Sequence, residues 1–163
     1  SLPNKWQRDV AAVCFDAGAK LVIGAHPHVL QPMEWRKESD QLIVYSLGNF
    51  VSGQRDRYKN GGAMLKVDLM KTVSDSVSTT RIDSAGYILE WVYRTADAKK
   101  YYYILPVPDF EEDTTAFITD DASKAALKLF IDDSRKLFKR HNVSLDEIKT
   151  PVHAGEALKP EEE

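Results

Sequence analysis

Cysteine and long apolar runs are the two features this sequence has least of. Cys14 is the single cysteine, so the chain can form neither an intramolecular disulfide nor a cysteine-rich zinc site. No stretch approaches the roughly 18 apolar residues that cross a bilayer, and no basic-then-apolar signal peptide opens the chain. We therefore predict no membrane span within these residues.

A large excess of charge of one sign is also absent. Lys and Arg number 22 against 25 Asp and Glu, which gives a formal net charge of −3. Proteins that bind nucleic acid or anionic lipid over a broad surface carry an excess of basic residues. The balance argues against such a surface, and we predict no nucleic-acid partner.

The chain does contain enough apolar residues for one core, since 43% of its 163 residues are hydrophobic. We predict a single domain over residues 1–150 and a flexible acidic tail over residues 151–163. The sequence starts at Ser1 rather than Met. We therefore expect a processed product or a part of a longer protein.

Hydrophobic periodicity predicts an α/β fold with an α+β tendency. The first segment is predicted to be an amphipathic helix with an apolar stripe formed by Trp6, Val10, Val13, Cys14 and Ala17. A buried strand at 20–24 and a hairpin of strands 29–36 and 41–50 follow. Further strands at 63–69, 78–83, 85–95 and 101–107 predict a largely antiparallel sheet. A long C-terminal helix, started by Asp121 or Ser123, is predicted to end near residues 141–142.

The strongest chemical signal is the segment Gly24-Ala25-His26-Pro27-His28, which follows the first buried strand. Ligand crevices in α/β sheets lie at the carboxyl ends of strands. In an extended backbone, His26 and His28 project to the same side and can face one metal. A turn whose histidines only pack or cap remains the alternative. Two imidazoles do not complete a metal site, and Asp16, Glu34 and Asn49 are the nearest candidates for further ligands.

A second segment of interest, residues 45–50, runs from an apolar strand into a corner of small residues at Gly48. Ser46 is not predicted to be a nucleophile, because no Gly-x-Ser-x-Gly elbow surrounds it. Asn49 is better explained as a side chain that caps the turn than as a ligand.

Together, residues 17–32 and 45–51 resemble the poly-γ-glutamate capsule-synthesis (CapA) family, which is similar to calcineurin-like metallophosphatases. The resemblance implies that His26 and His28 are ligands of divalent metal ions. It also implies a layered αββα sandwich with the metals at the strand ends, where they would activate a water molecule. Under this reading Gln31 and Glu34 lie near the substrate mouth, and Asn49 joins them as a substrate-binding residue.

The other ligand motifs of that family, an early Asp, Asn-Asn-His and His-Trp-Gly, do not occur in this sequence. We therefore expect the C-terminal portion of a capsule-family protein with an incomplete metal site. An unpaired strand edge and an uncovered apolar face would then need an upstream N-terminal half or a homo-oligomer to cover them.

Two functions remain open. The chain can be part of a metal-dependent hydrolase that is active only with the missing N-terminal half, or it can be a non-catalytic module that handles or assembles an anionic capsule polymer. The chain alone can also be inactive and serve only as a structural half. In the second case we expect salt-sensitive contacts from Arg55, Arg57 and Lys59 in the loop after the second motif. The resemblance implies a cell-envelope or extracellular setting.

Overall fold

Two β-sheets and three α-helices make up the computed structural model, which describes residues 1–74, 77–114 and 117–152. The smaller sheet contains β1 (Leu21–Ile23), β2 (Met33–Arg36) and β3 (Gln41–Val44) in the order β1-β3-β2. β1 lies parallel to β3, whereas β2 is antiparallel to it. A short 3-10 helix, η1 (Lys37–Ser39), joins β2 to β3. The predicted hairpin is confirmed, but its strands are shorter, since Pro32 offers no N–H to a ladder.

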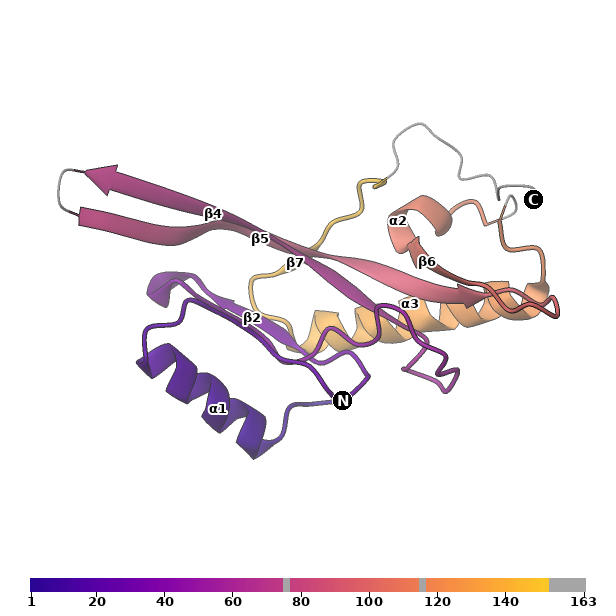
Figure 1. The fold of residues 1–163 in the computed structure, drawn as a ribbon, viewed down its shortest axis with the longest axis horizontal. Helices are drawn as coiled ribbons and strands as arrows, with labels where there is room; N and C mark the ends of the chain where they lie inside the picture. Colours follow the sequence, from indigo (N-terminus) through magenta and orange to yellow (C-terminus); the bar gives the residue numbers. More distant parts are fainter. Residues whose placement is uncertain (75–76, 115–116, 153–163) are drawn as a thin grey trace.

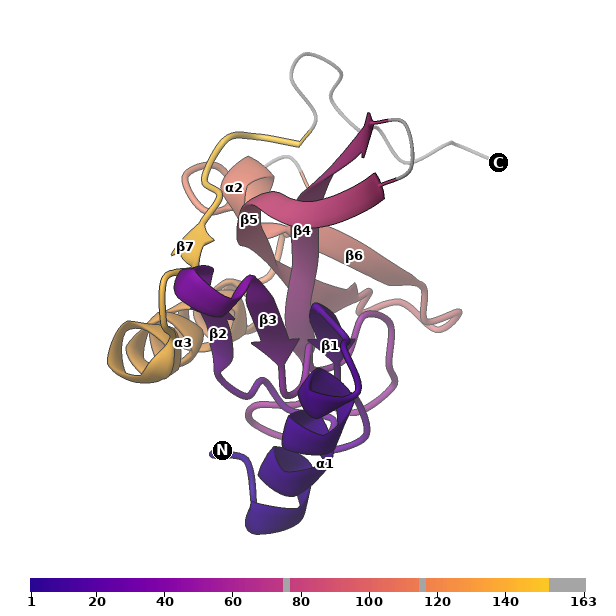
Figure 2. The ribbon, with the colours of Figure 1, turned by 90° about the vertical axis from the view of Figure 1, so that its left-hand side faces the viewer.

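Helix α1 (Lys5–Asp16) covers one face of the small sheet (Figure 2). Asn4 caps its first turn by accepting a hydrogen bond from the Gln7 amide, and Gln7 returns a bond to the Asn4 N–H. Its buried residues, Ala11 and Phe15, form a small core with Ile43 and Tyr45 of the sheet.

The predicted apolar stripe on α1 is exposed rather than buried. Trp6, Val10 and Val13 are 71%, 39% and 67% exposed, and Cys14 is only half-buried. The helix packs on the sheet through Ala11 and Phe15 on the adjacent face, so most of the stripe is left exposed. The periodicity predicted the helix correctly but assigned it the wrong buried face.

The larger sheet is antiparallel along β4 (Gly61–Ser74), β5 (Val77–Arg94) and β6 (Tyr102–Pro106), and β7 (Asp146–Glu147) pairs in parallel with β5. The two strands predicted at 78–83 and 85–95 are one strand, β5, and a shift in the register of its pairing with β4 lies next to the Ser84–Asp68 pair. β4 and β5 extend together as an arm beyond the rest of the fold (Figure 1). Leu69, Val73 and Val77 on this arm are exposed.

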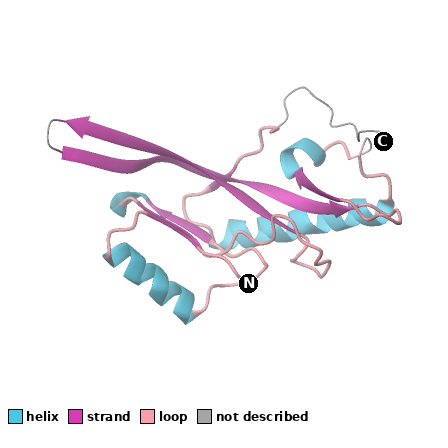
Figure 3. Ribbon diagram, viewed as in Figure 1, coloured by secondary structure: helices cyan, strands magenta, loops and turns pink. Residues whose placement is uncertain are grey.

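The strands of the larger sheet cross helix α3 (Asp121–His141), as Figure 3 shows, and the residues of the main core lie at this crossing. The predicted long helix is confirmed; its N-cap is Asp120, whose carboxylate accepts from the Ser123 amide. Leu127, Phe130 and Phe138 of α3 pack in one cluster with residues of β4, β5 and β6 and with the inner face of the small sheet. This cluster joins both sheets into one packed unit.

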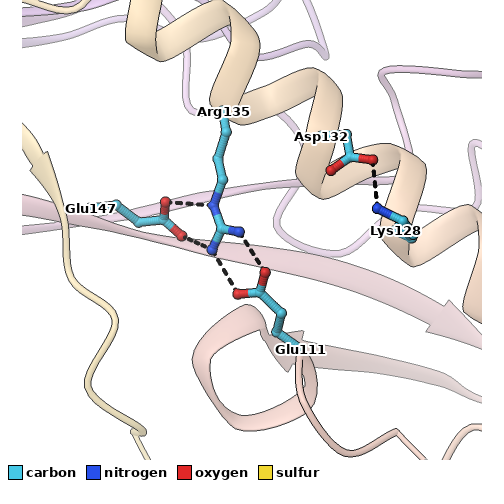
Figure 4. A network of polar contacts seen from close by, with 5 residues as sticks. All are labelled: Glu111, Lys128, Asp132, Arg135 and Glu147. Atoms are coloured by element: carbon cyan, nitrogen blue, oxygen red, sulfur yellow. Dashed lines mark hydrogen bonds and ion pairs between the residues drawn. The ribbon is translucent and has the colours of Figure 1, made fainter.

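Arg135 ties α3 to two other elements (Figure 4). Its guanidinium donates to both carboxylate oxygens of Glu147 in β7 at 2.8 Å and to Glu111, which follows α2 (Val107–Phe110). Two bidentate pairs on one guanidinium fix orientation as well as charge. The hydrogen bonds from Arg135 lower the pKa of the Glu111 carboxyl, and the pair with Glu147 holds the segment after α3 against the sheet.

The architecture is therefore mixed, with sheets and helices in the α+β manner that the sequence predicted. The sandwich layering implied by the family resemblance stays a prediction. Within the described ranges, no helix is both long and apolar enough to cross a membrane. Of the predicted tail, residues 153–163 lie outside the described residues.

Candidate functional site

The two candidate histidines lie in a turn that follows β1. Gly24 opens it by donating its N–H to the Val44 carbonyl at 2.7 Å. A Cβ at Gly24 would stand 2.5 Å from the Tyr45 carbonyl oxygen, so only glycine allows this approach of β1 to β3. The turn is thereby anchored at the carboxyl end of the small sheet.

The sequence analysis placed the two histidines on an extended backbone, but the backbone of the turn is not extended. His26 and His28 have φ values of 99° and 55°, in the left-handed region that side chains other than glycine seldom adopt. Such conformations cost about 1–3 kcal/mol each and persist only where the surroundings impose them. The prediction that strand alternation places both imidazoles on one side is therefore wrong, and the geometry of the turn sets their positions.

The turn brings the two imidazoles together all the same. Their ring centroids are 6.2 Å apart with an angle of 50° between the planes, and both residues are exposed. Zinc–imidazole bonds are about 2.0–2.1 Å long, and metals in two-metal sites lie about 3.5–4 Å apart. This spacing suits two imidazoles that ligate one ion or two neighbouring ions.

Asn49 connects the second motif to His28. Its Oδ1 lies 2.8 Å from His28 Nδ1, while its Nδ2 donates to the Gln54 side chain at 2.9 Å and to the Lys59 carbonyl at 2.8 Å. Because both hydrogens of the amide are used, Oδ1 is the acceptor, and we assign the proton of neutral His28 to Nδ1. The lone pair of Nε2 is then left for a ligand, which is the usual arrangement of a metal-binding histidine.

The other predicted site residues, Gln31, Glu34 and Asp16, show no contact with the two histidines among the described residues. Gln31 is buried, and its amide bonds to Gln7 and to the Leu2 carbonyl, so it anchors the N-terminal segment. Glu34 pairs with Arg36 along β2 at 2.9 Å. Asp16 is exposed at the end of α1. Among the described residues, no group of three or more His, Cys, Asp and Glu side chains is placed to hold a metal ion.

A buried carboxyl group lies behind the second motif. Glu90 of β5 is fully buried, neither of its carboxyl oxygens has a hydrogen-bond partner among the residues that the structure describes, and burial raises its pKa to about 9. A Cβ on Gly62 would be 2.6 Å from Glu90 Oε1, 2.5 Å from the Leu47 carbonyl oxygen and 3.0 Å from that of Asn49. The missing side chain of Gly62 is therefore what lets the motif pack over Glu90.

The cations predicted to contact a polymer already have partners. Arg57 forms a bidentate pair with Asp133, and Lys59 lies 3.4 Å from Asp56. Arg55 donates to the Val92 carbonyl at 2.7 Å and to the Ser52 carbonyl at 2.6 Å. These contacts hold the loop in place.

Sequence reasoning missed Glu90 and the contact of the loop with α3. The signal for Glu90 was a single charged residue inside the apolar run Ile88-Leu89-Glu90-Trp91-Val92. Nothing in the sequence connects Arg57 with Asp133, because 76 positions separate them.

Comparison with known proteins places the two motifs in a family. The family model described as "Bacterial capsule synthesis protein PGA_cap" matches residues 1–54. The chain is 40% identical over 81 residues, half of its length, to "PGA biosynthesis protein CapA" of Bacillus subtilis (strain 168). It is 27% identical over 147 residues, 90% of its length, to "Capsule biosynthesis protein CapA" of Bacillus anthracis.

These alignments span 21% and 32% of the lengths of the two relatives. No solved structure gives a significant match. The family match covers the residues that form α1, the small sheet and the His26–His28 turn. Over these residues the chain is similar to the bacterial capsule synthesis (CapA) proteins.

Proposed function

We propose that this chain acts in the biosynthesis of an anionic capsule polymer, poly-γ-glutamate or a related one, and that His26 and His28 supply two ligands of a divalent metal site. The bond between Asn49 and His28 carries the proposal. It joins the two motifs of the family match and leaves Nε2 of His28 unprotonated for a ligand. The names of the relatives support a role in capsule biosynthesis.

The donor set fits a metal in part. Neutral imidazoles suit zinc, iron and manganese alike when oxygen ligands join them, and this turn presents two imidazoles. A metal held there would activate water and polarise a phosphoryl oxygen, as in metal-dependent phosphoesterases. The residues of this chain would hold the ion through His26 and His28, while Asn49 keeps His28 oriented. Gln31 and Glu34 are candidates for contacts with the substrate farther from the ion.

The remaining ligands would come from a surface that covers α1 and β1. Among the described strands β1 pairs only with β3, so its other edge has no strand partner there, and Ile23 on it is 53% exposed. Trp6 and Val13 are exposed on α1, which contacts β1. We propose that a further part of the same polypeptide or a second copy of the chain packs here, in a cell-envelope setting.

If α1 and β1 pack against another surface, the chain should self-associate. The 163-residue chain alone should self-associate as its concentration rises, because exposed apolar side chains find a partner in a second copy. Sedimentation velocity over a concentration series measures this, and Trp6→Gln with Val13→Gln should shift the chain toward monomer. A strict monomer at high concentration would count against the proposed surface.

The metal proposal predicts the behaviour of single variants. His28→Ala and His26→Ala should each lower Zn²⁺ or Mn²⁺ binding at least about tenfold, since loss of a ligand costs more than loss of an outer partner, which costs about 10–100-fold. Asn49→Leu should weaken binding less, because the imidazole remains but is no longer oriented. Isothermal titration with each metal gives the affinities.

His141→Ala is the matched control, because His141 lies at the end of α3 and outside the turn. Equal loss in the control, or unchanged binding in His28→Ala, would contradict the metal proposal.

A non-catalytic role in handling the polymer is the second candidate, and the lack of a three-ligand cluster in the described ranges favours it for the chain by itself. The two roles differ in their response to a chelator. Chelator-sensitive hydrolysis of a generic phosphodiester supports the enzyme. Polymer binding that survives the chelator, without hydrolysis, supports the handling module.

A further inference from the structure

A cavity of about 510 Å³ lies between α3 and the loop that joins β3 to β4. Its walls include Leu30, Ala126, Leu129 and Phe130, which give it an apolar side. Sites for small ligands fall in the range of about 300–1,000 Å³ and combine apolar walls with a few polar groups. In size and lining, the cavity resembles a ligand site.

The ion pair between Arg57 and Asp133 fixes the distance between the two walls. Arg57 Nε and an Nη donate to the two carboxylate oxygens of Asp133 at 2.8 and 2.9 Å, and its guanidinium lies 5.0 Å from the centre of the Tyr58 ring. Asp133 is the single carboxylate on the lining, and Arg57 compensates its charge. The loop and the helix are thereby held apart at a set width.

Three further cations line the cavity without a carboxylate partner among the described residues: Arg55, Lys136 and Arg140. Lys136 and Arg140 are exposed and lie one turn apart on α3. Arg55 donates only to backbone carbonyls, and burial together with the nearby charge of Arg94 lowers its pKa. In a chain with a net charge of −3, this lining carries a local positive surplus that an anion would balance.

We propose that this cavity binds a carboxylate-bearing chain, with methylene groups on the apolar wall and carboxylates at Lys136 and Arg140. A γ-linked glutamate unit has this chemistry, since each repeat carries two methylene groups and one free carboxylate. The choice of this ligand rests on the proposed role in capsule-polymer biosynthesis. The site itself lies outside the family match and uses neither histidine of the turn.

A titration calorimetry experiment with a short γ-glutamate oligomer tests the site. The double variant Lys136→Gln/Arg140→Gln should bind about tenfold more weakly than the wild type, because it loses two charge-assisted contacts. Its affinity should also depend less on salt, since fewer ionic contacts remain. Thermal unfolding of each protein checks that the fold is kept; both substituted residues are exposed.

Lys66→Gln/Lys71→Gln is the matched control, because it changes net charge equally at exposed positions of β4, outside the cavity lining. It should bind the oligomer as the wild type does. Equal weakening in both double variants, or full affinity in Lys136→Gln/Arg140→Gln, would overturn the proposal.

Two more measurements separate this site from the metal site. A fully methyl-esterified oligomer should not bind, because its carboxylates are neutral. His26→Ala/His28→Ala should keep the wild-type affinity for the oligomer. A wild-type chain that binds no oligomer while it binds metal through His28 would refute the cavity site and leave the metal site standing.

Discussion

Replacing Glu90 with Gln should stabilise the protein at neutral pH and leave it almost unchanged near pH 4. The carboxyl is fully buried and has no hydrogen-bond partner within the described part of the chain, and burial raises its pKa to about 9 from an ordinary value of 4.5. Between these values the native state keeps a proton that the unfolded chain releases. The free energy of unfolding therefore falls as pH rises from about 4.5 to about 9 and then levels off.

The size of this effect follows from the same linkage. One pKa unit corresponds to about 1.4 kcal/mol, so at pH 7 the Glu90 contribution reaches at most about 3 kcal/mol. Gln has nearly the shape of Glu but does not ionise, so Glu90→Gln removes this dependence of the free energy of unfolding on pH. Urea unfolding of both proteins across the pH range measures the difference.

Glu38→Gln is the control for this prediction, because Glu38 is exposed on η1. The free energy of unfolding of Glu38→Gln should change with pH as that of the wild type does. A Glu90→Gln profile that runs parallel to the wild type would show that Glu90 does not hold its proton in the folded state.

Gly62→Ala should destabilise the protein and also disturb the His28 site. The added Cβ would meet two backbone carbonyl oxygens, those of Leu47 and Asn49, together with the carboxyl of Glu90. Backbone atoms cannot move aside as a flexible side chain can, so we expect a loss of about 3 kcal/mol, at the upper end for overpacking. Shifting the Asn49 backbone should also lengthen its bond to His28 and weaken metal binding.

Gly53→Ala provides the comparison, since its Cβ would lie 3.6 Å from the Tyr102 hydroxyl, an ordinary contact. Its stability should stay within about 1 kcal/mol of the wild type. Chemical unfolding combined with metal titration covers both effects. If Gly62→Ala proved as stable as Gly53→Ala, the close packing of the motif over Glu90 would be wrong.

Much of the fold could be predicted because its signals are local. Apolar periodicity predicted α3, although its N-cap is Asp120 and not Asp121 or Ser123, and the β-branched run at residues 20–24 predicted the strand that precedes the histidine turn. The buried face of α1 could not be predicted in this way. Its exposed stripe and its buried Ala11 and Phe15 have similar hydrophobicity, and only the packing against β3 separates them.

The site could be predicted only in part, because its geometry also depends on contacts between segments that are distant in the sequence. His26 and His28 stand out by their spacing, but their left-handed backbone depends on the approach of Gly24 to Tyr45 across the sheet. The role of Asn49 depends on a contact with His28 from 21 residues away. Glu90, Asp133 and Arg140 acquire their surroundings only when β5 and α3 pack against the loop after β3.

The central claim is that Asn49 orients His28 so that Nε2 can bind a metal beside His26. Long-range nitrogen–proton NMR spectra of the imidazoles, recorded with and without Zn²⁺, test it most directly. We expect neutral His28 to carry its proton on Nδ1, and Nε2 of His28 together with one ring nitrogen of His26 to shift when zinc is added. A His28 proton on Nε2, or zinc-induced shifts at His141 but at neither histidine of the turn, would contradict the account.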